Sequence, residues 1–247
     1  MTETIRQLHE RKSTRAFTDE PITAPEREAI LHAAAAAPTA GNQQLYTILD
    51  IDDPALREKL VDTCDHQPFI AKAPLVLIFC ADCLKWQRIY LEAGLTPRAP
   101  GAGDLMLAVC DAAIAAQNAV AAAHSLGLGS CYIGDIMENC EAQRELLGLP
   151  EYVFPAVMLL FGHPTEQQKE RQKPARMALE HIVHKNTYRE LPGDELRQMI
   201  LPRCGLQSYE DWVGAFMNRK YNSDFSREMT RSVEEYLRQF GMERKPD

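Results

Sequence analysis

One long run rich in alanine, residues 104–127, constrains the fold more than any other feature of this sequence. Small side chains on all sides of such a helix let neighbouring elements approach closely. We therefore expect this helix to be central to the protein or to lie at a dimer seam. Asp111, Gln117, Asn118 and His124 interrupt the apolar run, which argues against a membrane span.

Three short apolar segments read as strands, and polar or helical segments separate them. The strands are expected within residues 45–51, 74–80 and 152–164, where β-branched and other apolar side chains dominate. A capping box of Thr23 and Glu26 begins a helix that stops before Pro38, and Asp53 precedes another helix. Helices alternating with a few separated strands indicate an α+β or α/β protein.

Composition narrows the class of protein. The 27 Lys and Arg residues against 35 Asp and Glu give a formal net charge of −8, which argues against a nucleic-acid scaffold. The polar amino-terminal stretch lacks the apolar core of a signal peptide. Seven cysteines, an odd number in no regular framework, suggest reduced thiols in a cytosol.

Two patterns raise the question of a metal site. Cys80 and Cys83 form a C-x-x-C pair with no second pair nearby, so strand-end packing is favoured over metal or redox work. His181 and His184 are three residues apart, and no other ligand pattern joins them. No metal site is expected.

A basic cluster lies near the start of the chain. Alternate residues of an extended segment share a side, so Arg11, Ser13 and Arg15 can converge on one point. Two guanidinium groups and a hydroxyl suit a phosphate monoester, and Lys12 points elsewhere or adds a point charge. The same residues also fit a solvated basic turn at a helix C-terminus, where cations are favoured in any case.

Three further stretches carry candidate binding groups. Thr39, Asn42, Gln43 and Gln44 form a polar loop after Pro38, which suits either recognition of a heteroaromatic ring or an ordinary helix-to-strand connection. Glycines 127, 129 and 134 allow close backbone approach to a planar ligand, or make a simple turn. Lys173 and Arg176 can close a phosphate site or stay solvated. No dinucleotide-binding or P-loop glycine motif occurs.

Taken in order, these four stretches resemble the FMN-dependent nitroreductase family across roughly residues 3–190. Arg11–Arg15 matches its R-x-S-x-R/K motif, and Pro38–Gln44 matches P-S-x-x-N-x-Q. Gly127–Gly134 and Lys173–His184 match its glycine turn and its late basic segment. The resemblance implies an α+β nitroreductase-like fold, with a central mixed, mostly antiparallel sheet flanked by helices, in an intertwined homodimer. Residues 1–190 would form the FMN-binding domain. Residues 191–247 would form a helical extension packed on the same domain or on the partner subunit.

The resemblance also implies a function. A family member would take hydride from NADH or NADPH on bound FMN and reduce an electron-poor acceptor, such as a nitroaromatic or a quinone, by a ping-pong mechanism. It would be a cytoplasmic homodimer that acts on a small molecule, without nucleic-acid or membrane partners. The alternative is a flavin-binding or partner-binding protein that keeps the fold but turns over little.

The family's site residues carry over by motif. The FMN phosphate would meet the cationic set Arg11, Lys12, Ser13, Arg15, Lys173 and Arg176. The ribityl chain and ring would meet Pro38, Thr39, Ala40, Asn42 and Gln44, with one group reaching in from the second subunit. Tyr132, Ile133 and Gly134 would lie along the flavin, with a backbone N–H near Gly134 aimed at N5 as the catalytic contact.

Other positions match the family more loosely. Gln67 or His66 would lie at the pyrimidine edge of the ring. Trp86, Tyr90 and the loop to Gly103 either cover the substrate side or pack as a short amphipathic helix. The sequence departs from many members at Leu45-Tyr46, where they have Pro-Trp, and at Asp135, where some carry Glu.

Overall fold

The computed structural model describes residues 1–242 and divides the chain into two compact units. The first unit combines Met1–Arg171 with the residues from Glu228 onward, and the second is Gln172–Arg227. The predicted limit at residue 190 concerns the extent of the family's domain, so it stays a prediction. Along the chain, the boundaries between the two compact units fall between residues 171 and 172 and between residues 227 and 228.

The first unit alternates helices and strands as the sequence predicts. Its helices are α1 (Glu3–Glu10), α2 (Ala24–Ala35), α3 (Pro54–Thr63), α4 (Leu84–Glu92), α5 (Ala102–Ser125), α6 (Cys140–Leu147), α7 (Glu166–Glu170) and most of α10 (Asp224–Arg238). Its strands are β1 (Tyr46–Asp50), β2 (Leu75–Asp82), β3 (Gly129–Ile133) and β4 (Val153–Gly162), and two short 3-10 helices are η1 (Ala40–Asn42) and η2 (Asp135–Met137).

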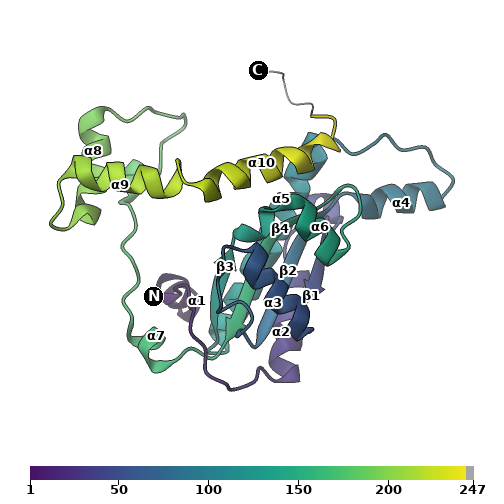
Figure 1. Ribbon diagram of the computed structural model, residues 1–247, viewed down its shortest axis with the longest axis horizontal. Helices are drawn as coiled ribbons and strands as arrows, with labels where there is room; N and C mark the ends of the chain where they lie inside the picture. The colour runs from purple at the N-terminus through teal and green to yellow at the C-terminus, as the bar shows by residue number, and fades with distance from the viewer. Residues whose placement is uncertain (243–247) are drawn as a thin grey trace. The chain divides into compact units, whose positions relative to one another are not determined.

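The four strands form one sheet in the order β1-β2-β4-β3 (Figure 1). All three strand pairs are antiparallel, and within residues 1–242 a parallel contact occurs only as an isolated bridge between Ser13 and Ser130. The α+β class and the mostly antiparallel sheet are therefore confirmed. Because β3 lies at one edge of the sheet, it is open to pairing with the segment that contains Ser13.

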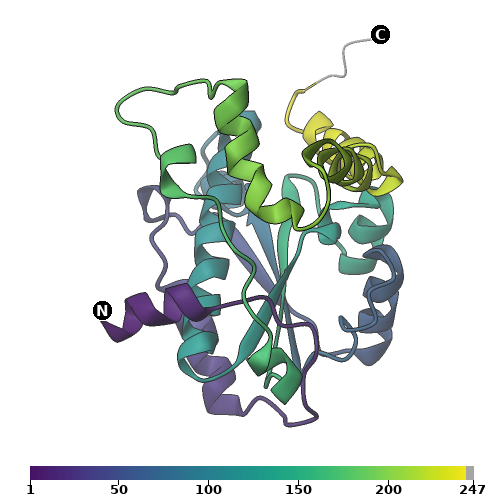
Figure 2. The same ribbon diagram turned by 90° about the vertical axis from the view of Figure 1, so that its left-hand side faces the viewer.

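Helices cover both faces of this sheet, as Figure 2 shows with α2 and α5 on one side and α3 on the other. All eight residues of β2 are buried, which explains why its sequence is continuously apolar. Leu77 and Phe79 belong to the cluster with α2 and α5, whereas Val76 and Ile78 belong to the cluster with α3. The period of two along β2 thus divides the core into two layers.

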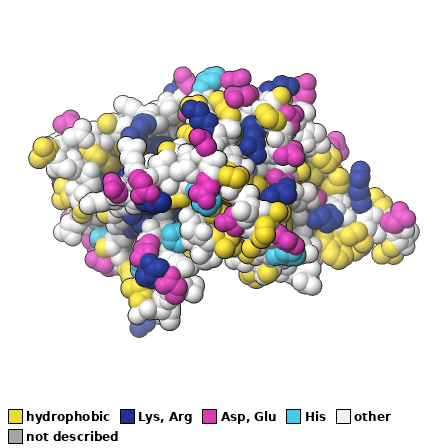
Figure 3. Space-filling view, turned by 90° about the horizontal axis from the view of Figure 1, so that it is seen from below, with side chains coloured by type: hydrophobic (Ala, Val, Ile, Leu, Met, Phe, Trp, Pro, Cys, Tyr) yellow, Lys and Arg dark blue, Asp and Glu magenta, His cyan; other side chains and the backbone are white. Residues whose placement is uncertain are grey.

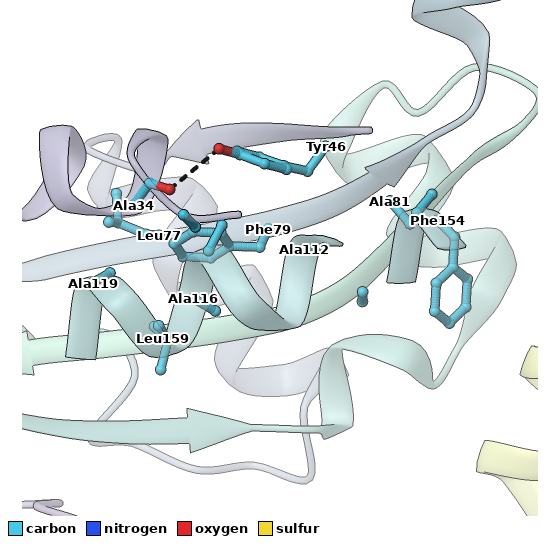
Figure 4. Close-up of a cluster of buried hydrophobic side chains, with 14 of the residues drawn as sticks. Ala34, Tyr46, Leu77, Phe79, Ala81, Ala112, Ala116, Ala119, Phe154 and Leu159 are labelled. Carbon is cyan, nitrogen blue, oxygen red and sulfur yellow. Dashed lines mark hydrogen bonds between the residues drawn. The ribbon is translucent and has the colours of Figure 1, made fainter. Parts of the chain in front are cut away.

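The alanine-rich helix α5 is the central helix that the sequence predicts. The helix packs against α2 and strands β2 and β4, and six of its alanines are fully buried: Ala108, Ala112, Ala115, Ala116, Ala119 and Ala123. Figure 4 shows Ala112, Ala116 and Ala119 among the buried side chains of this cluster. Among the described residues α5 is also the one helix long and apolar enough to cross a membrane. Its inward face is instead occupied by protein, as in the core helix of a globular fold.

Local signals fix the ends of several helices. Thr23 and Glu26 form the reciprocal capping box at the start of α2, and Asp53 accepts the N–H of Ala55 at the start of α3, at 2.9 Å. Gly127, with φ +80°, ends α5 in a left-handed conformation that favours glycine. The predicted starts of α2 and α3 are confirmed to within a few residues.

The second unit is helical. It contains η3 (Leu179–His181), α8 (Gly193–Cys204), α9 (Tyr209–Lys220) and the first residues of α10. An ion pair between Arg197 and Glu210 joins α8 to α9 at 2.8 Å, and Trp212 stacks on Phe216. Leu196 lies in α8, Trp212 in α9 and Tyr236 in α10.

The packing of α5 gives a stability prediction. Replacing Ala116 by Leu adds three carbon atoms where no space exists, and we expect a loss of about 1–3 kcal/mol in the free energy of unfolding. The matched control is Ala29→Leu at an exposed position of α2, which should change stability by less than about 0.5 kcal/mol. Urea denaturation of both variants makes the comparison, and equal losses would contradict the close packing of α5.

Candidate functional site

The basic segment lies against the edge strand β3. The N–H of Thr14 donates to the carbonyl of Ser130 at 2.8 Å, and Thr14 itself is buried. A Cβ atom at Gly129 would lie only 2.5 Å from the Thr14 hydroxyl oxygen, so the close contact requires glycine there. Gly129 thus makes room for a side chain of this chain, which differs from the predicted approach to a ligand. Thr14 is turned inward, and its alternating neighbours Ser13 and Arg15 lie on the other side of the extended segment.

Two cations of this segment meet β3. Burial raises the pKa of the Cys131 thiol, and Arg15 and Arg11 are close enough to act in the opposite direction. Burial also raises the pKa of Tyr132 to about 12, against a lowering effect of Arg11. The Nη1 atom of Arg11 is buried and has no hydrogen-bond partner among the described residues. A buried donor of this kind calls for an acceptor, and an anion would supply one.

Lys12 faces the other way and binds backbone. Its ammonium donates to the carbonyl of Lys169 at 2.6 Å and to that of Arg171, while the Arg171 guanidinium donates to the carbonyl of Ser13. The N–H of Arg15 donates to the side chain of Gln168 at 3.2 Å. This clamp fixes the backbone of the basic segment. Contact of Lys12 with a phosphate stays a prediction, and its ammonium already has two carbonyl partners.

The polar loop after α2 has an unusual backbone. Gly41, Asn42 and Gln44 have φ of 56°, 56° and 51°, so two residues other than glycine take the left-handed conformation. Asn42 is exposed, whereas the Gln44 amide donates to the carbonyl of Ala35 at 3.2 Å. The indole N–H of Trp86 donates to the carbonyl of Gln43 at 2.8 Å, so α4 helps to hold the loop.

A buried carboxylate lies beneath this loop. Asp111 of α5, only 2% exposed, accepts hydrogen bonds from the Thr39 hydroxyl, from the N–H of Ala40 at 3.0 Å and from the N–H of Leu45 at 3.2 Å. The Thr39 oxygen in turn accepts the N–H of Gln44 at 2.7 Å. A carboxylate among alanines marks Asp111 as unusual in the sequence, but nothing in the sequence identifies this loop as its partner.

The glycine turn at Gly134 begins where β3 ends, at Ile133. Ile133 is 2% exposed and belongs to the core, so a ligand can reach only its backbone. Gly134 is exposed at the start of η2, and its carbonyl accepts the N–H of Met137 at 3.1 Å. Tyr132 reaches α5, where its hydroxyl bonds to the side chain of Gln117 at 3.1 Å. The three residues thus form an ordered strand and turn beside the basic segment.

The remaining candidates lie outside this group. Gln67 follows α3, and its amide donates to the carbonyl of Cys64 at 3.0 Å, while His66 is exposed beside it. Lys173 and Arg176 belong to the second compact unit. Their predicted roles, like those of the other motif residues, stay predictions.

Trp86 and Tyr90 line a pocket of about 280 Å³ next to the polar loop. Gln43 of the loop forms part of its wall, and the ring centroids of Trp86 and Tyr90 are 5.8 Å apart. Trp86 packs against the core and also borders this pocket, and the role of the two aromatic residues on the substrate side stays a prediction.

Cys80 and Cys83 are packing residues at the end of β2, as expected. Burial raises the pKa of each thiol to about 12, which keeps both protonated at neutral pH. Within residues 1–242, no three His, Cys, Asp or Glu side chains are grouped so that they could hold a metal ion.

A second buried carboxyl group lies just beyond the turn. Glu138 is 5% exposed, and its Oε1 atom has no hydrogen-bond partner among the described residues. Burial, with a smaller effect of the nearby carboxylates of Asp135, Asp65 and Glu228, raises the pKa of Glu138 to about 8. Glu138 is therefore mainly protonated at neutral pH.

Most residues of this site fall within the part of the chain that matches a known protein family. A profile of the nitroreductase family matches residues 8–163, which include the basic segment, the polar loop and the turn after β3. The chain belongs to the nitroreductase family.

Individual relatives cover most of the chain. The FMN reductase (NAD(P)H) of Bacillus subtilis is 34% identical over 96% of this chain and 91% of its own. The oxygen-insensitive NADPH nitroreductase of Salmonella typhimurium is 41% identical over 77% of each chain. The NADPH:FMN oxidoreductase of Vibrio harveyi, solved with NAD+, has a TM-score of 0.82 and 27% identity over 96% of this chain and 98% of its own.

Glu138 gives a prediction on pH. The folded protein keeps a proton on Glu138 up to pH about 8, whereas the unfolded chain loses it near the ordinary value of 4.5. The free energy of unfolding therefore falls as pH rises between these values, and Glu138→Gln should remove a cost on the order of 1–3 kcal/mol at the upper end. We expect this variant to gain more thermal stability at pH about 8 than at pH about 5.

The control for this experiment is Glu141→Gln. Hydrogen bonds from Arg231 lower the pKa of Glu141 to about 2, so its removal should not stabilise the protein at either pH. A Glu138→Gln variant that is no more stable than the parent at the higher pH would contradict the buried, protonated state.

Proposed function

We propose that the protein is an FMN-dependent oxidoreductase that takes hydride from NAD(P)H and reduces an electron-poor small molecule such as a nitroaromatic or a quinone. One observation carries the proposal: the buried Nη1 of Arg11, without a protein partner among the described residues, lies in a cationic segment beside β3. The family membership and the names of the relatives support the same reaction.

The residues present fit the phosphate of FMN. Arg11 and Arg15 are guanidinium donors on one extended segment, which suits a dianionic phosphate ester. Ser13 lies between them in the chain, and its carbonyl accepts a hydrogen bond from the Arg171 guanidinium. We assign Lys173 and Arg176 to the same phosphate on the match to the family motif.

Bound FMN would supply the redox chemistry, accepting hydride from the nicotinamide and then reducing the acceptor in a second half-reaction. The chain's own part is binding and orientation. In our assignment the exposed backbone at Gly134 donates toward the reactive edge of the ring, and Asn42 and Gln44 meet the ribityl chain and the ring. Gln67 takes the pyrimidine edge.

We place the acceptor on the side bordered by Trp86 and Tyr90. Their pocket adjoins Gln43, the neighbour of two loop residues assigned to the flavin, and aromatic walls suit a planar acceptor. The pocket carries an ion pair between Arg98 and Asp104 at its rim, at 2.6 Å.

A cytoplasmic enzyme without nucleic-acid or membrane partners fits the remaining observations. All seven cysteines are free thiols, which suits a reducing compartment. Basic and acidic side chains are interspersed over the face seen in Figure 3, in keeping with the net charge of −8.

We further propose a homodimer that pairs through α5. Opposite its alanine face, the helix exposes Met106, Leu107 and Ile114 by 62%, 51% and 41%. Together with exposed Cys110 and Ala113, they follow the spacing of one helix face. A contiguous apolar stripe of this kind marks an interaction surface, and a twofold dimer can bury it against itself.

The function is tested by binding and reduction of FMN. We expect the purified protein to bind FMN, to turn yellow and to bleach when NADH or NADPH is added without oxygen. Arg11→Ala and Arg15→Ala should each weaken FMN binding by about 1.5–3 kcal/mol, as measured by calorimetric titration of the apoprotein, because each removes a charged hydrogen bond.

Lys169→Ala is the matched control for these variants, since only its backbone carbonyl takes part in the clamp. Unchanged FMN affinity in both arginine variants would contradict the phosphate site. Protein that binds FMN but is not bleached by either nicotinamide would instead favour a flavin-binding protein with little turnover.

The dimer is tested by Ile114→Glu. Dimerisation would bury an unpaired carboxylate in the centre of the stripe, which is energetically costly. We therefore expect the molecular mass measured by light scattering to fall from that of a dimer to that of a monomer. Ala29→Glu on the exposed face of α2 is the control and should leave the mass unchanged. A monomeric parent protein, or a dimeric Ile114→Glu variant, would contradict pairing through α5.

A further inference from the structure

We infer that Asp111 is a positioning residue, whose buried carboxylate fixes the conformation in which residues 39–45 present Asn42 and Gln44 to the flavin. The part that concerns the flavin rests on the proposed function. The hydrogen bonds themselves do not depend on it.

The carboxylate is arranged as a hub for this one loop. It accepts one hydroxyl and two backbone N–H groups, which come from Thr39, Ala40 and Leu45. The bonds therefore reach both ends of the loop. Through Thr39, whose oxygen accepts the N–H of Gln44 at 2.7 Å, the hub also reaches a fourth residue. A buried carboxylate needs several donors to offset its lost hydration, and the loop supplies them.

The loop requires such a hub because its backbone is strained. Asn42 and Gln44 are in the left-handed conformation, which side chains other than glycine rarely adopt. Conformations of this kind persist only when surrounding contacts impose them, and they concentrate at binding sites. The strain thus falls on the two residues that we assign to the flavin.

Two helices divide the work of holding the loop. From α4, Trp86 donates to the carbonyl of Gln43 at 2.8 Å. Lys85 donates to the carbonyl of Gln44 at 3.4 Å and to that of Tyr46, directly after the loop, at 2.7 Å. From α5, Asp111 accepts hydrogen bonds from the N–H groups of Ala40 and Leu45. Donors of α4 therefore fix carbonyl groups, and the acceptor of α5 fixes N–H groups. Removal of the acceptor leaves buried donors without partners.

The test uses Asp111→Asn and Thr39→Val, with Thr39→Ser as the conservative variant that keeps the hydroxyl. Asn118→Ala is the matched control, because Asn118 also lies on α5 and donates to a backbone carbonyl, that of Ala33 at 3.1 Å, outside the loop. Amide hydrogen exchange is measured first, in protein freed of FMN. We expect protection at Ala40 and Leu45 to fall by about tenfold or more in Asp111→Asn and to stay at the parent level in Asn118→Ala.

FMN affinity and the visible circular dichroism of bound FMN give the second readout. Asp111→Asn and Thr39→Val should bind FMN roughly tenfold or more weakly than the parent, with an altered circular dichroism spectrum of the flavin. Thr39→Ser, which keeps the hydroxyl, should lie closer to the parent than Thr39→Val in both affinity and spectrum. A general loss of stability would act alike in Asp111→Asn and Asn118→Ala.

Two outcomes would overturn the inference: parent-level protection at Ala40 and Leu45 in Asp111→Asn, or equal losses of FMN affinity in Asp111→Asn and Asn118→Ala. Failure of the parent protein to bind FMN would end the proposed function. The exchange data decide the role of Asp111 in the loop independently, since they are recorded without flavin.

Discussion

The close approach of α5 to the sheet is the constraint on which the rest of the structure depends. Six fully buried alanines let the helix lie directly on β2 and β4, and no larger side chain would fit there. Because α5 is held so near, the short side chain of Asp111 can reach the loop that precedes β1. Core packing and loop geometry are therefore two results of the same alanine-rich face.

The edge of the sheet is the second organising element. An edge strand exposes unpaired backbone groups, and β3 uses them to bind the amino-terminal segment through Thr14 and Ser130. That contact brings Arg11 and Arg15 to Cys131, and the turn at Gly134 follows at the end of the same strand. Segments far apart in the sequence thus meet along five residues of β3.

Much of this arrangement could be predicted from the sequence, and the reasons are local. Apolar runs identified β1, β2 and β4, and a capping box identified α2. Alternation predicted that Arg11 and Arg15 share a side, and both lie close enough to Cys131 to affect its pKa. The roles of Lys12, Gly129 and Asp111 could not be predicted, because each depends on a partner far along the chain. Lys12 binds carbonyls more than 150 residues away, and Gly129 is required by the methyl and hydroxyl groups of Thr14.

The way in which the loop between α2 and β1 is held has an evolutionary consequence. The hydrogen bonds to the loop involve main-chain atoms and Thr39, and they leave the side chain of Gln43 free to line the pocket of Trp86 and Tyr90. Mutations of Gln43 can alter which molecules the enzyme accepts, while the scaffold beneath it is inherited unchanged. New specificities can then arise by single steps, without a new backbone having to be found.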